Sequence, residues 1–582
     1  MGQKERHSHS KSNCNCDKNQ CGGHNNGSSF HNGGGHHRES NLNELSLPLI
    51  LDKNPRDFTR EDFLHLIEYL DIKQLNFHYN GLDGQLKELK IPVNSLEYAD
   101  LVLAQGERID GSSIFKGVID TSKSDLYIVP IYRFAFLSPF EKNTLSFMCT
   151  FLDRDGGLTE ASPDNVLLKA HQDFKKQTKL ELNALGELEF YLLYDKETNR
   201  FPNTPQNAYH QTTPFSKKGH IINHMMKIIS SLTCAVKYSH AEVGFIPEVN
   251  SIYPEINGKV AEQFEIEFLP RPIYDMGVYL NLSKWIIKNV AYLYGANVTF
   301  TPKLQEGMAG TGLHIHLELK KDGKNIMVDP KTKVLSKEAR HMIVGLCSKA
   351  KSLTAFGNTV ASSYMRLVPH QEAPTRICWS EQNRSALIRV PLGWGDLLSA
   401  NLADLVNNSV DKNFQNKPKK EAKKEAKNKK TDKKIKEQKN SDENDNFKNN
   451  SRQTIEIRSP DGSANINLLL AGISVAIREG MSDPYAEDTA NKLHVVGNIF
   501  NNEELKNSLD TLPVNCLESA NVLKDDRAIY EKHGIFPTKM IDYTINKLRQ
   551  EIDPTEDQKY KHSSKEEQLE IFSKVLHKDF HK

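Results

Sequence analysis

The sequence predicts an α+β protein, because two different hydrophobic periodicities occur along the chain. Apolar residues recur at helical spacing in residues 58–70, 283–294 and 340–353. Short segments of another kind alternate charged or histidine residues with large apolar ones, which is typical of strands with one buried face. The two patterns together indicate a mixed α and β fold.

The predicted elements follow one another in a definite order. A helix at 58–70 precedes two strands, at 76–79 and 86–93, which a turn at Asp83 and Gly84 joins. The alternating strands and the two later helices then follow at 186–193, 263–268, 283–294, 312–317, 340–353 and 454–458. The sequence shows no internal repeat.

Composition and charge exclude several classes of protein. The 582 residues carry 76 Lys and Arg against 75 Asp and Glu, which gives a net charge of +1. This balance provides no general attraction to nucleic acid or to an anionic membrane, so we expect neither as a partner. The longest apolar stretch, Ile466–Ile477, is shorter than the ~20 residues that a membrane span needs. Eight sparse cysteines and the lack of an apolar leader predict a reducing, cytoplasmic location.

Two segments of biased composition interrupt the globular pattern. Residues 1–45 are rich in Asn, Gly, Ser, His and Lys, and residues 411–452 combine many lysines with almost no apolar residue. Such segments cannot bury enough apolar surface to fold, so we expect a disordered tail and a disordered insertion. Metal scavenging by the tail and binding of nucleic acid or another anionic partner by the insertion are the functional alternatives.

The alternating strands place groups that bind divalent metal on one face. Because residues i and i+2 of a strand share a face, each strand presents a pair of such groups. The pairs are Glu187 and Glu189, Glu265 and Glu267, His314 and His316, and Glu456 and Arg458. One strand of this kind would indicate only a solvated face, but four together favour a site with cations between the carboxylates. Several carboxylates with one histidine per site suit Mg²⁺ or Mn²⁺ better than Zn²⁺.

Several arginines complete this set. Arg366, Arg384, Arg389 and Arg458 offer planar groups suited to carboxylate and phosphate. A cation site beside such groups points to ATP and a small carboxylic acid, the substrates of a ligase. The sequence contains no Walker-type G-x-x-x-x-G-K-[ST], which argues against a P-loop nucleotide site.

Five separated motifs give this chain a specific resemblance. In order they begin at Asp110 (DGSSI), Glu187 (ELEF), Gly310 (GTGLHIH), Asn383 (NRSA) and Glu456 (EIRSPD). Their sequences and order resemble type I glutamine synthetases. The resemblance implies a small N-terminal β-grasp domain at 46–160 and a large α/β catalytic domain at 161–582. It also implies a curved antiparallel sheet lining the active site, and a dodecamer of two hexameric rings with active sites between neighbours.

The resemblance also assigns roles to individual residues. It implies one metal held by Glu189, Glu242 and Glu265, and a second held by Glu187, His314 and Glu456. Glu262 and Glu267 remain alternatives to Glu265, since the spacing after Glu242 is longer than usual. Two or more Mg²⁺ or Mn²⁺ ions per subunit are therefore expected, with ATP as co-substrate. The ATP-binding residues would be His316, Arg384 and Arg389, and the residues around substrate would be Gly310, Arg366, Glu372, Arg458 and Tyr209.

Three of these residues would take part in the chemistry. Arg384 would offset charge during phosphoryl transfer, Glu372 would cover the reactive acyl phosphate, and Asp110 would help to deprotonate ammonium in a neighbouring subunit. The implied reaction is the ATP-dependent ligation of ammonia to L-glutamate, giving L-glutamine, ADP and phosphate through γ-glutamyl phosphate. The alternatives are a γ-glutamyl-amine ligase of the same superfamily and a non-catalytic structural homologue. Departures from the family pattern at Lys237, Ala241, Ala309, Glu318 and Thr454 predict altered affinities rather than lost chemistry.

Overall fold

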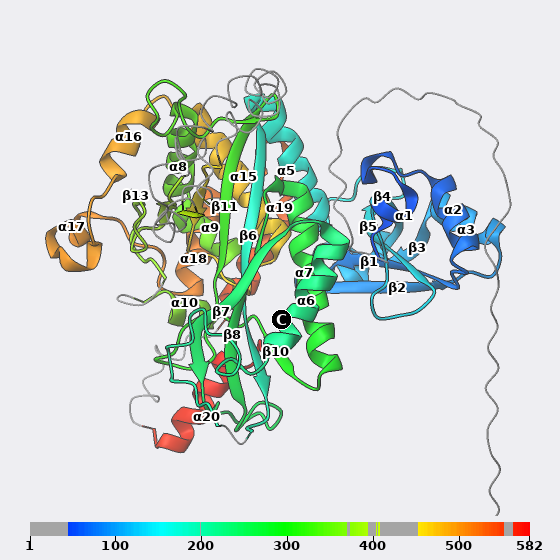
Figure 1. Cartoon of the computed structure of the whole chain (residues 1–582). Coiled ribbons are helices and arrows are strands. Elements are labelled where there is room, and N and C mark those ends of the chain that lie inside the picture. Colours follow the sequence, from blue (N-terminus) through cyan, green and yellow to red (C-terminus); the bar gives the residue numbers. More distant parts are fainter. Residues whose placement is uncertain are drawn as a thin grey trace, which may run out of the picture. The chain divides into compact units, whose positions relative to one another are not determined.

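The computed structural model contains two β-sheets with helices packed against them (Figure 1). It describes residues 45–197, 200–368, 373–393, 403, 406–407, 452–551 and 563–581. The tail predicted at 1–45 and the insertion predicted at 411–452 lie outside these residues, apart from Leu45 and Arg452. The mixed α and β fold that the two periodicities predict is confirmed.

The smaller sheet lies near the start of the described chain and has the strand order β2-β1-β5-β4-β3. Its strands are β1 (Gln74–Asn80), β2 (Leu86–Pro92), β3 (Glu107–Asp110), β4 (Asp125–Leu137) and β5 (Thr144–Leu152). β1 and β2 form the predicted hairpin, whose turn contains Gly84 at φ 77°. The predicted first helix is α2 (Arg60–Tyr69), and it begins where Thr59 and Asp62 form a reciprocal capping box.

The larger sheet is built from long, curved strands (Figure 1) and has the main strand order β13-β14-β15-β11-β6-β8-β7. Its central strands are β6 (Glu181–Tyr194), β7 (Val236–Ile246), β8 (Val260–Phe268) and β11 (Leu313–Lys321), followed by β13 (Trp379–Glu381), β14 (Ile388–Val390) and β15 (Ile455–Ile457). Three two- or three-residue strands, β9 (Arg271–Pro272), β10 (Asn297–Thr299) and β12 (Lys324–Asn325), pair at its margins. Neighbouring strands along the main order are antiparallel, with one parallel exception, β13 with β14.

Alternation along β6 shows why this sheet has two different faces. Leu188 and Phe190 are fully buried in the main hydrophobic core, whereas Glu187 and Glu189 point to the opposite face. The core side is packed by α5 (Pro163–Thr178), α7 (Ile273–Leu293) and α8 (Lys337–Ser348), and α15 (Ile466–Ser482) packs against these three helices. With helices covering one face, the charged face of the sheet is left to form a site.

Two predicted helices differ from the observed ones. The helix predicted at 283–294 begins ten residues earlier, at Ile273, because α7 is buried around most of its circumference and loses its amphipathic signal. The helix predicted at 340–353 is two helices, α8 and α9 (Ala350–Gly357). Lys349 leaves helical dihedrals between them, and its ammonium group lies 3.2 Å from Asp526 on α18 (Cys516–Glu531). Tertiary contact with α18 therefore accompanies a break that local periodicity does not reveal.

The apolar stretch Ile466–Ile477 lies within α15, where almost every residue is buried in the core. Across the ranges that the structure describes, none of the helices is both long and apolar enough to cross a membrane.

A buried carboxylate connects the smaller sheet to two helices on the core side of the larger sheet. Asp164, the second residue of α5, accepts hydrogen bonds from Asn80 of β1 at 2.8 Å and from Asn467 of α15 at 2.7 Å. Burial raises its pKa from 3.8 to about 6, although the two amides oppose the shift. The protonated form is therefore favoured in the folded state, and its contribution to stability is complete below pH 3.8 and lost as pH rises through about 6.

Replacing Asp164 with asparagine is expected to stabilise the protein at neutral pH. The amide oxygen can still accept both hydrogen bonds, while the variant avoids a charge whose burial corresponds to roughly 3 kcal/mol. Melting temperatures of the two proteins, measured from pH 5 to 8, should diverge by a few degrees in favour of Asp164→Asn. A difference in melting temperature that stays constant across this range would contradict the prediction.

Candidate active site

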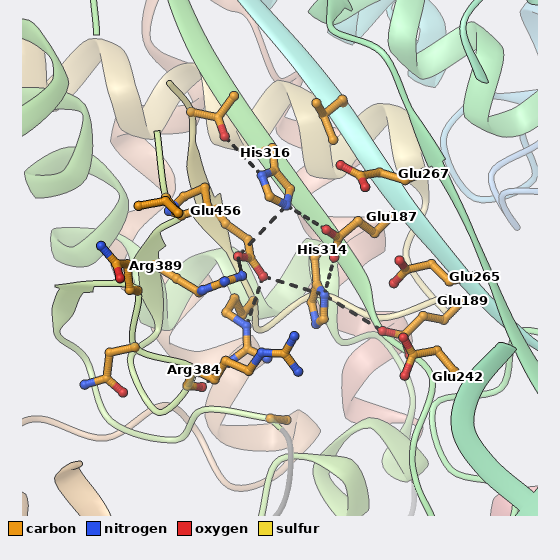
Figure 2. A pocket seen from close by; sticks show the side chains of 18 of the residues that line it. Glu187, Glu189, Glu242, Glu265, Glu267, His314, His316, Arg384, Arg389 and Glu456 are labelled. Carbon is orange, nitrogen blue, oxygen red and sulfur yellow. Dashed lines mark hydrogen bonds and ion pairs between the residues drawn. The ribbon is translucent and has the colours of Figure 1, made fainter. Parts of the chain in front are cut away.

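The charged face of the larger sheet lines an open cavity of about 2030 Å³. Strands β6, β7, β8, β11 and β15 supply its floor, and the loops around residues 307–310, 380–385 and 495–498 supply its walls. Carboxylates, imidazoles and guanidinium groups from these elements point toward one another in the cavity (Figure 2). The four alternating strands thus converge on one site, as their sequences predict.

The strand register arranges these side chains in rows across the sheet. His316 of β11 lies opposite Glu456 of β15, which lies opposite Arg389 of β14. His314 and Glu267 both lie opposite Glu187. In a third row, β8 places Glu265 between Glu189 of β6 and His240 of β7. Because residues directly opposite in antiparallel strands have Cβ atoms roughly 5 Å apart, the register alone brings these groups together.

Glu187 is at the centre of the site. Its two carboxylate oxygens lie 2.8 Å from Nδ1 of His314 and 2.8 Å from Nε2 of His316. Glu456 in turn accepts from Nη1 of Arg389 at 2.9 Å and from Nε of Arg458 at 3.0 Å. These contacts hold two carboxylates between the imidazoles of β11, a guanidinium group of β14 and the guanidinium group that follows β15.

The pKa values show that the site accumulates negative charge. Burial alone would raise the pKa of Glu187 and Glu456, but the neighbouring histidines, and Arg458 beside Glu456, outweigh it and the net shifts are downward. At Glu189 the nearby positive charge does not offset burial, so burial and the charge of Glu242 raise its pKa to about 7. Burial and four neighbouring glutamates raise the pKa of Glu265 well above its ordinary value. Added positive charge is needed to keep all of these groups ionised.

The donor set fits divalent cations. Three groups of side chains have potential ligand atoms within 4.8 Å of one another. They are Glu187, His316 and Glu456; Glu187, Glu265 and His314; and His240, Glu242 and Glu265. Carboxylate oxygen with one imidazole per group suits Mg²⁺ or Mn²⁺. All six residues expected to bind metal line the same cavity.

Two features of these groups differ from the expected assignment. Glu189 is in none of the three groups, and its Oε2 accepts from the backbone N–H of Gly312 at 2.7 Å and from Gln263 at 3.0 Å. His240, which was not among the expected ligands, is in one of them. The sequence did carry a signal for it, because His240 and Glu242 are two residues apart on one strand, as in the other pairs.

Glu262, Glu265 and Glu267, the three candidates for the metal ligand that follows Glu242 in the sequence, have different surroundings in the structure. Glu262 accepts from the backbone N–H of Lys217 at 3.1 Å and is not among the described residues that line the cavity. Glu267 lines the cavity but forms an ion pair of 2.6 Å with Lys237. Glu265 lies among the other carboxylates (Figure 2) and belongs to two of the three groups. The geometry therefore favours Glu265.

The expected ATP- and substrate-binding residues that are described also line the cavity. These are Gly310, Arg366, Arg384, Arg389, Arg458, His316 and Tyr209. Arg384 interacts with the hydroxyl of Tyr209, and its carbonyl oxygen accepts from Arg458. Arg366 donates to the carbonyl oxygen of Ser459 at 2.9 Å, which fixes its guanidinium group next to His314.

Of the other two expected catalytic residues, only Asp110 is described, and it is not among the described residues that line the cavity. Glu372 lies outside the described residues. Asp110 is exposed at the start of α4 (Gly111–Ile114), where its carboxylate accepts from Ser112 and Ser113. Hydrogen bonds from Ser113 and Ser112 lower its pKa to about 2, so it is ionised at neutral pH. Asp110 is thus a preorganised carboxylate on the surface, separate from this chain's own cavity.

The residues that depart from the family pattern have defined partners. Thr454 lies 3.1 Å from Nδ1 of His316, which orients that ring toward Glu187. Glu318 accepts from Asn183 at 3.0 Å and from Asn325 at 2.6 Å, so its buried carboxylate is satisfied. The carbonyl oxygen of Ala309 accepts from Tyr191. These residues are part of the wall of the cavity and leave the central carboxylates in place.

Comparison with known proteins agrees with this geometry. A family model described as "Glutamine synthetase, catalytic domain" matches residues 160–399 and 443–566, and one described as "Glutamine synthetase, beta-Grasp domain" matches residues 71–154. The glutamine synthetase of Clostridium saccharobutylicum is 27% identical over 478 residues, which are 81% of this chain and 90% of that protein. The glutamine synthetase of Thermus thermophilus is 30% identical over 345 residues, 57% of this chain and 72% of that protein.

Solved structures share the fold at lower sequence identity. A glutamine synthetase from Plasmodium falciparum superposes with a TM-score of 0.64 at 21% identity, covering 88% of this chain and 98% of that one. A complex titled GmaS/ADP superposes with a TM-score of 0.63 at 17% identity, covering 87% and 97%. The β-grasp and catalytic architecture expected from the five motifs is confirmed.

Proposed function

This chain belongs to the glutamine synthetase family, and we propose that it ligates ammonia to the γ-carboxylate of L-glutamate while ATP is converted to ADP and phosphate. One observation carries the proposal. The register of the larger sheet brings carboxylates, imidazoles and arginines together in a single cavity large enough for a nucleotide and an amino acid. A scaffold without turnover would have no need to maintain this buried charge.

The first step of the proposed reaction is phosphoryl transfer. The γ-carboxylate of glutamate attacks the γ-phosphorus of ATP, the bond to ADP breaks, and γ-glutamyl phosphate forms. Mg²⁺ or Mn²⁺, when bound, offsets the negative charge of the two reactants. Glu187, Glu456 and His314 would hold one cation, and Glu242 and Glu265 would hold another. Arg384 and Arg389 would stabilise the charge that develops on the transferred group.

The second step is attack by ammonia. Ammonium gives a proton to a carboxylate, ammonia attacks the acyl carbon of γ-glutamyl phosphate, and phosphate leaves. We assign the proton acceptor to Asp110 of a neighbouring copy, because Asp110 is ionised and exposed outside this chain's own cavity. The proposal therefore includes a ring-shaped assembly, with a dodecamer of two hexamers as its expected form. Glu372 retains its proposed role of covering the acyl phosphate, and the expected location is the cytoplasm.

Release of phosphate from ATP tests the reaction. Assays with glutamate should compare ammonium, putrescine and no amine, each with Mg²⁺ and with Mn²⁺. We expect strong stimulation by ammonium, because the acyl phosphate needs a nucleophile to turn over once water is excluded. Stimulation by putrescine alone would instead identify a γ-glutamyl-amine ligase. No release under any of these conditions would contradict catalysis and support a structural homologue.

A further inference from the structure

The third group of potential metal ligands is built on two neighbouring strands. β7 carries His240 and Glu242 on one face, and β8 places Glu265 opposite His240. Nε2 of His240 lies 3.1 Å from Oε1 of Glu265, and its Nδ1 lies 3.5 Å from Oε1 of Glu242. An imidazole thus lies between two carboxylates in the wall of the cavity.

Nδ1 of His240 also has a partner in the backbone. Nδ1 of His240 lies 3.2 Å from the carbonyl oxygen of Ala241. A hydrogen bond from Nδ1–H to a backbone carbonyl selects the tautomer whose Nε2 carries a free electron pair, and histidines that bind metal are commonly held in this way. The available nitrogen is the one that faces Glu265.

Aromatic neighbours fix the orientation of the ring. The centroid of His240 lies 4.4 Å from that of His210, 5.4 Å from that of Tyr209 and 5.9 Å from that of Tyr238. Its side chain is only 12% exposed. The imidazole is therefore held in place before any ion binds, which lowers the entropic cost of ligation.

Glu189 is less available than His240 for the same ion. One of its oxygens already accepts from Gly312 and Gln263, and the other lies 3.8 Å from His314. Within the described part of the chain, no hydrogen bond of Nε2 of His240 is seen besides its contact with Glu265. The geometry therefore favours His240, and not Glu189, as the third ligand beside Glu242 and Glu265.

We propose that His240 binds a divalent cation through Nε2, together with Glu242 and Glu265, and that this site selects a first-row transition ion such as Mn²⁺ over Mg²⁺. The proposal rests on the proposed function and deepens it by naming the class of ion. Imidazole nitrogen is a good ligand for transition ions, whereas Mg²⁺ prefers oxygen ligands and retains its water. Loss of this nitrogen should therefore weaken Mn²⁺ binding more than Mg²⁺ binding.

Binding of the ions alone tests the proposal without turnover. Free Mn²⁺ is measured by electron paramagnetic resonance while Mn²⁺ is titrated into the full chain, and Mg²⁺ affinity is obtained by competition. In His240→Ala we expect Mn²⁺ affinity at this site to fall about tenfold or more and Mg²⁺ affinity by less than about threefold. The comparison variant is His210→Ala, which removes a tilted ring neighbour of His240 but keeps the ligand nitrogen, so we expect both affinities to fall by less than about threefold and without selectivity.

Several results would overturn the proposal. Equal loss of both ions in His240→Ala, or loss of neither, would show that the imidazole does not provide selectivity. The same selective loss in His210→Ala would assign the effect to ring packing. Should the alanine variant not fold, His240→Gln supplies the same comparison with a larger side chain. Because these titrations contain no substrate, absence of ligase activity would overturn the proposed function and leave the ion selectivity of His240 to be judged separately.

Discussion

Replacing Glu187 with glutamine is expected to lower turnover by about 10³-fold or more. Glu187 contacts both His314 and His316 and belongs to two of the three potential metal-binding groups. A glutamine amide has no negative charge and only one acceptor oxygen, so it would hold a cation less tightly than the carboxylate does. Removal of a single preorganised charge-stabilising group costs roughly 10²–10³-fold, and Glu187 serves two groups at once.

The same substitution should also remove stabilisation by metal. An ion present at 100 times its dissociation constant stabilises the folded protein by about 2.7 kcal/mol, which raises the melting temperature. Melting curves with and without Mg²⁺ or Mn²⁺ should therefore show a smaller shift for Glu187→Gln than for the unaltered protein. Glu181→Gln is a matched control in the same strand, because the Glu181 carboxylate forms an ion pair with Lys175 and is not among the described residues that line the cavity. Unchanged turnover and an unchanged metal shift in Glu187→Gln would contradict the proposed site.

Much of the site could be predicted from the sequence because strand alternation is a strict geometric rule. Glu187 and Glu189 had to share a face, and so did His314 and His316. The sequence could not supply the register that places these pairs opposite one another, since register depends on the whole sheet. The five motifs compensated, because their order and residues identify a family whose fold fixes that register.

Other features depend on contacts that no local pattern records. Glu189 accepts hydrogen bonds from Gly312 and Gln263, and both come from distant segments. His240 is grouped with Glu265 by a pairing across two strands. The break between α8 and α9 accompanies the contact of Lys349 with Asp526, 177 residues further along the chain. In each case tertiary structure overrides or completes a correct local signal.

The proposed reaction divides the site between two copies of the chain. The cavity contains the residues proposed for phosphoryl transfer, but Asp110 lies elsewhere on the surface and is fixed there by two serines. A carboxylate held ionised and exposed is suited to act on a substrate bound by a neighbour. Under this proposal, glutamine synthesis requires two or more copies of the chain to assemble, whereas binding of metal in the cavity requires only one.

Replacing Arg384 with lysine is expected to lower kcat by about 10²-fold with a smaller effect on the KM for ATP. Arg384 reaches the cavity from the loop between β13 and β14, near Glu456 and Tyr209. Asn383 stabilises this loop by accepting from Ser385 and by donating to the carbonyl oxygen of Gly497 at 2.7 Å. Lysine retains the charge but loses the planar pair of donors that fits a phosphoryl group, so the loss should be greatest in the transition state.

Steady-state kinetics of three proteins separate this role from a structural one. The control is Arg376→Lys, because Arg376 lies in the same segment but donates to the carbonyl oxygen of Leu509 at 3.1 Å. We expect the control to change kcat by less than about twofold, since its contact lies away from the reacting groups. A loss that appears only in KM would assign Arg384 to ground-state binding. Equal losses of kcat in both variants would show that the segment, and not the Arg384 guanidinium group, is what turnover requires.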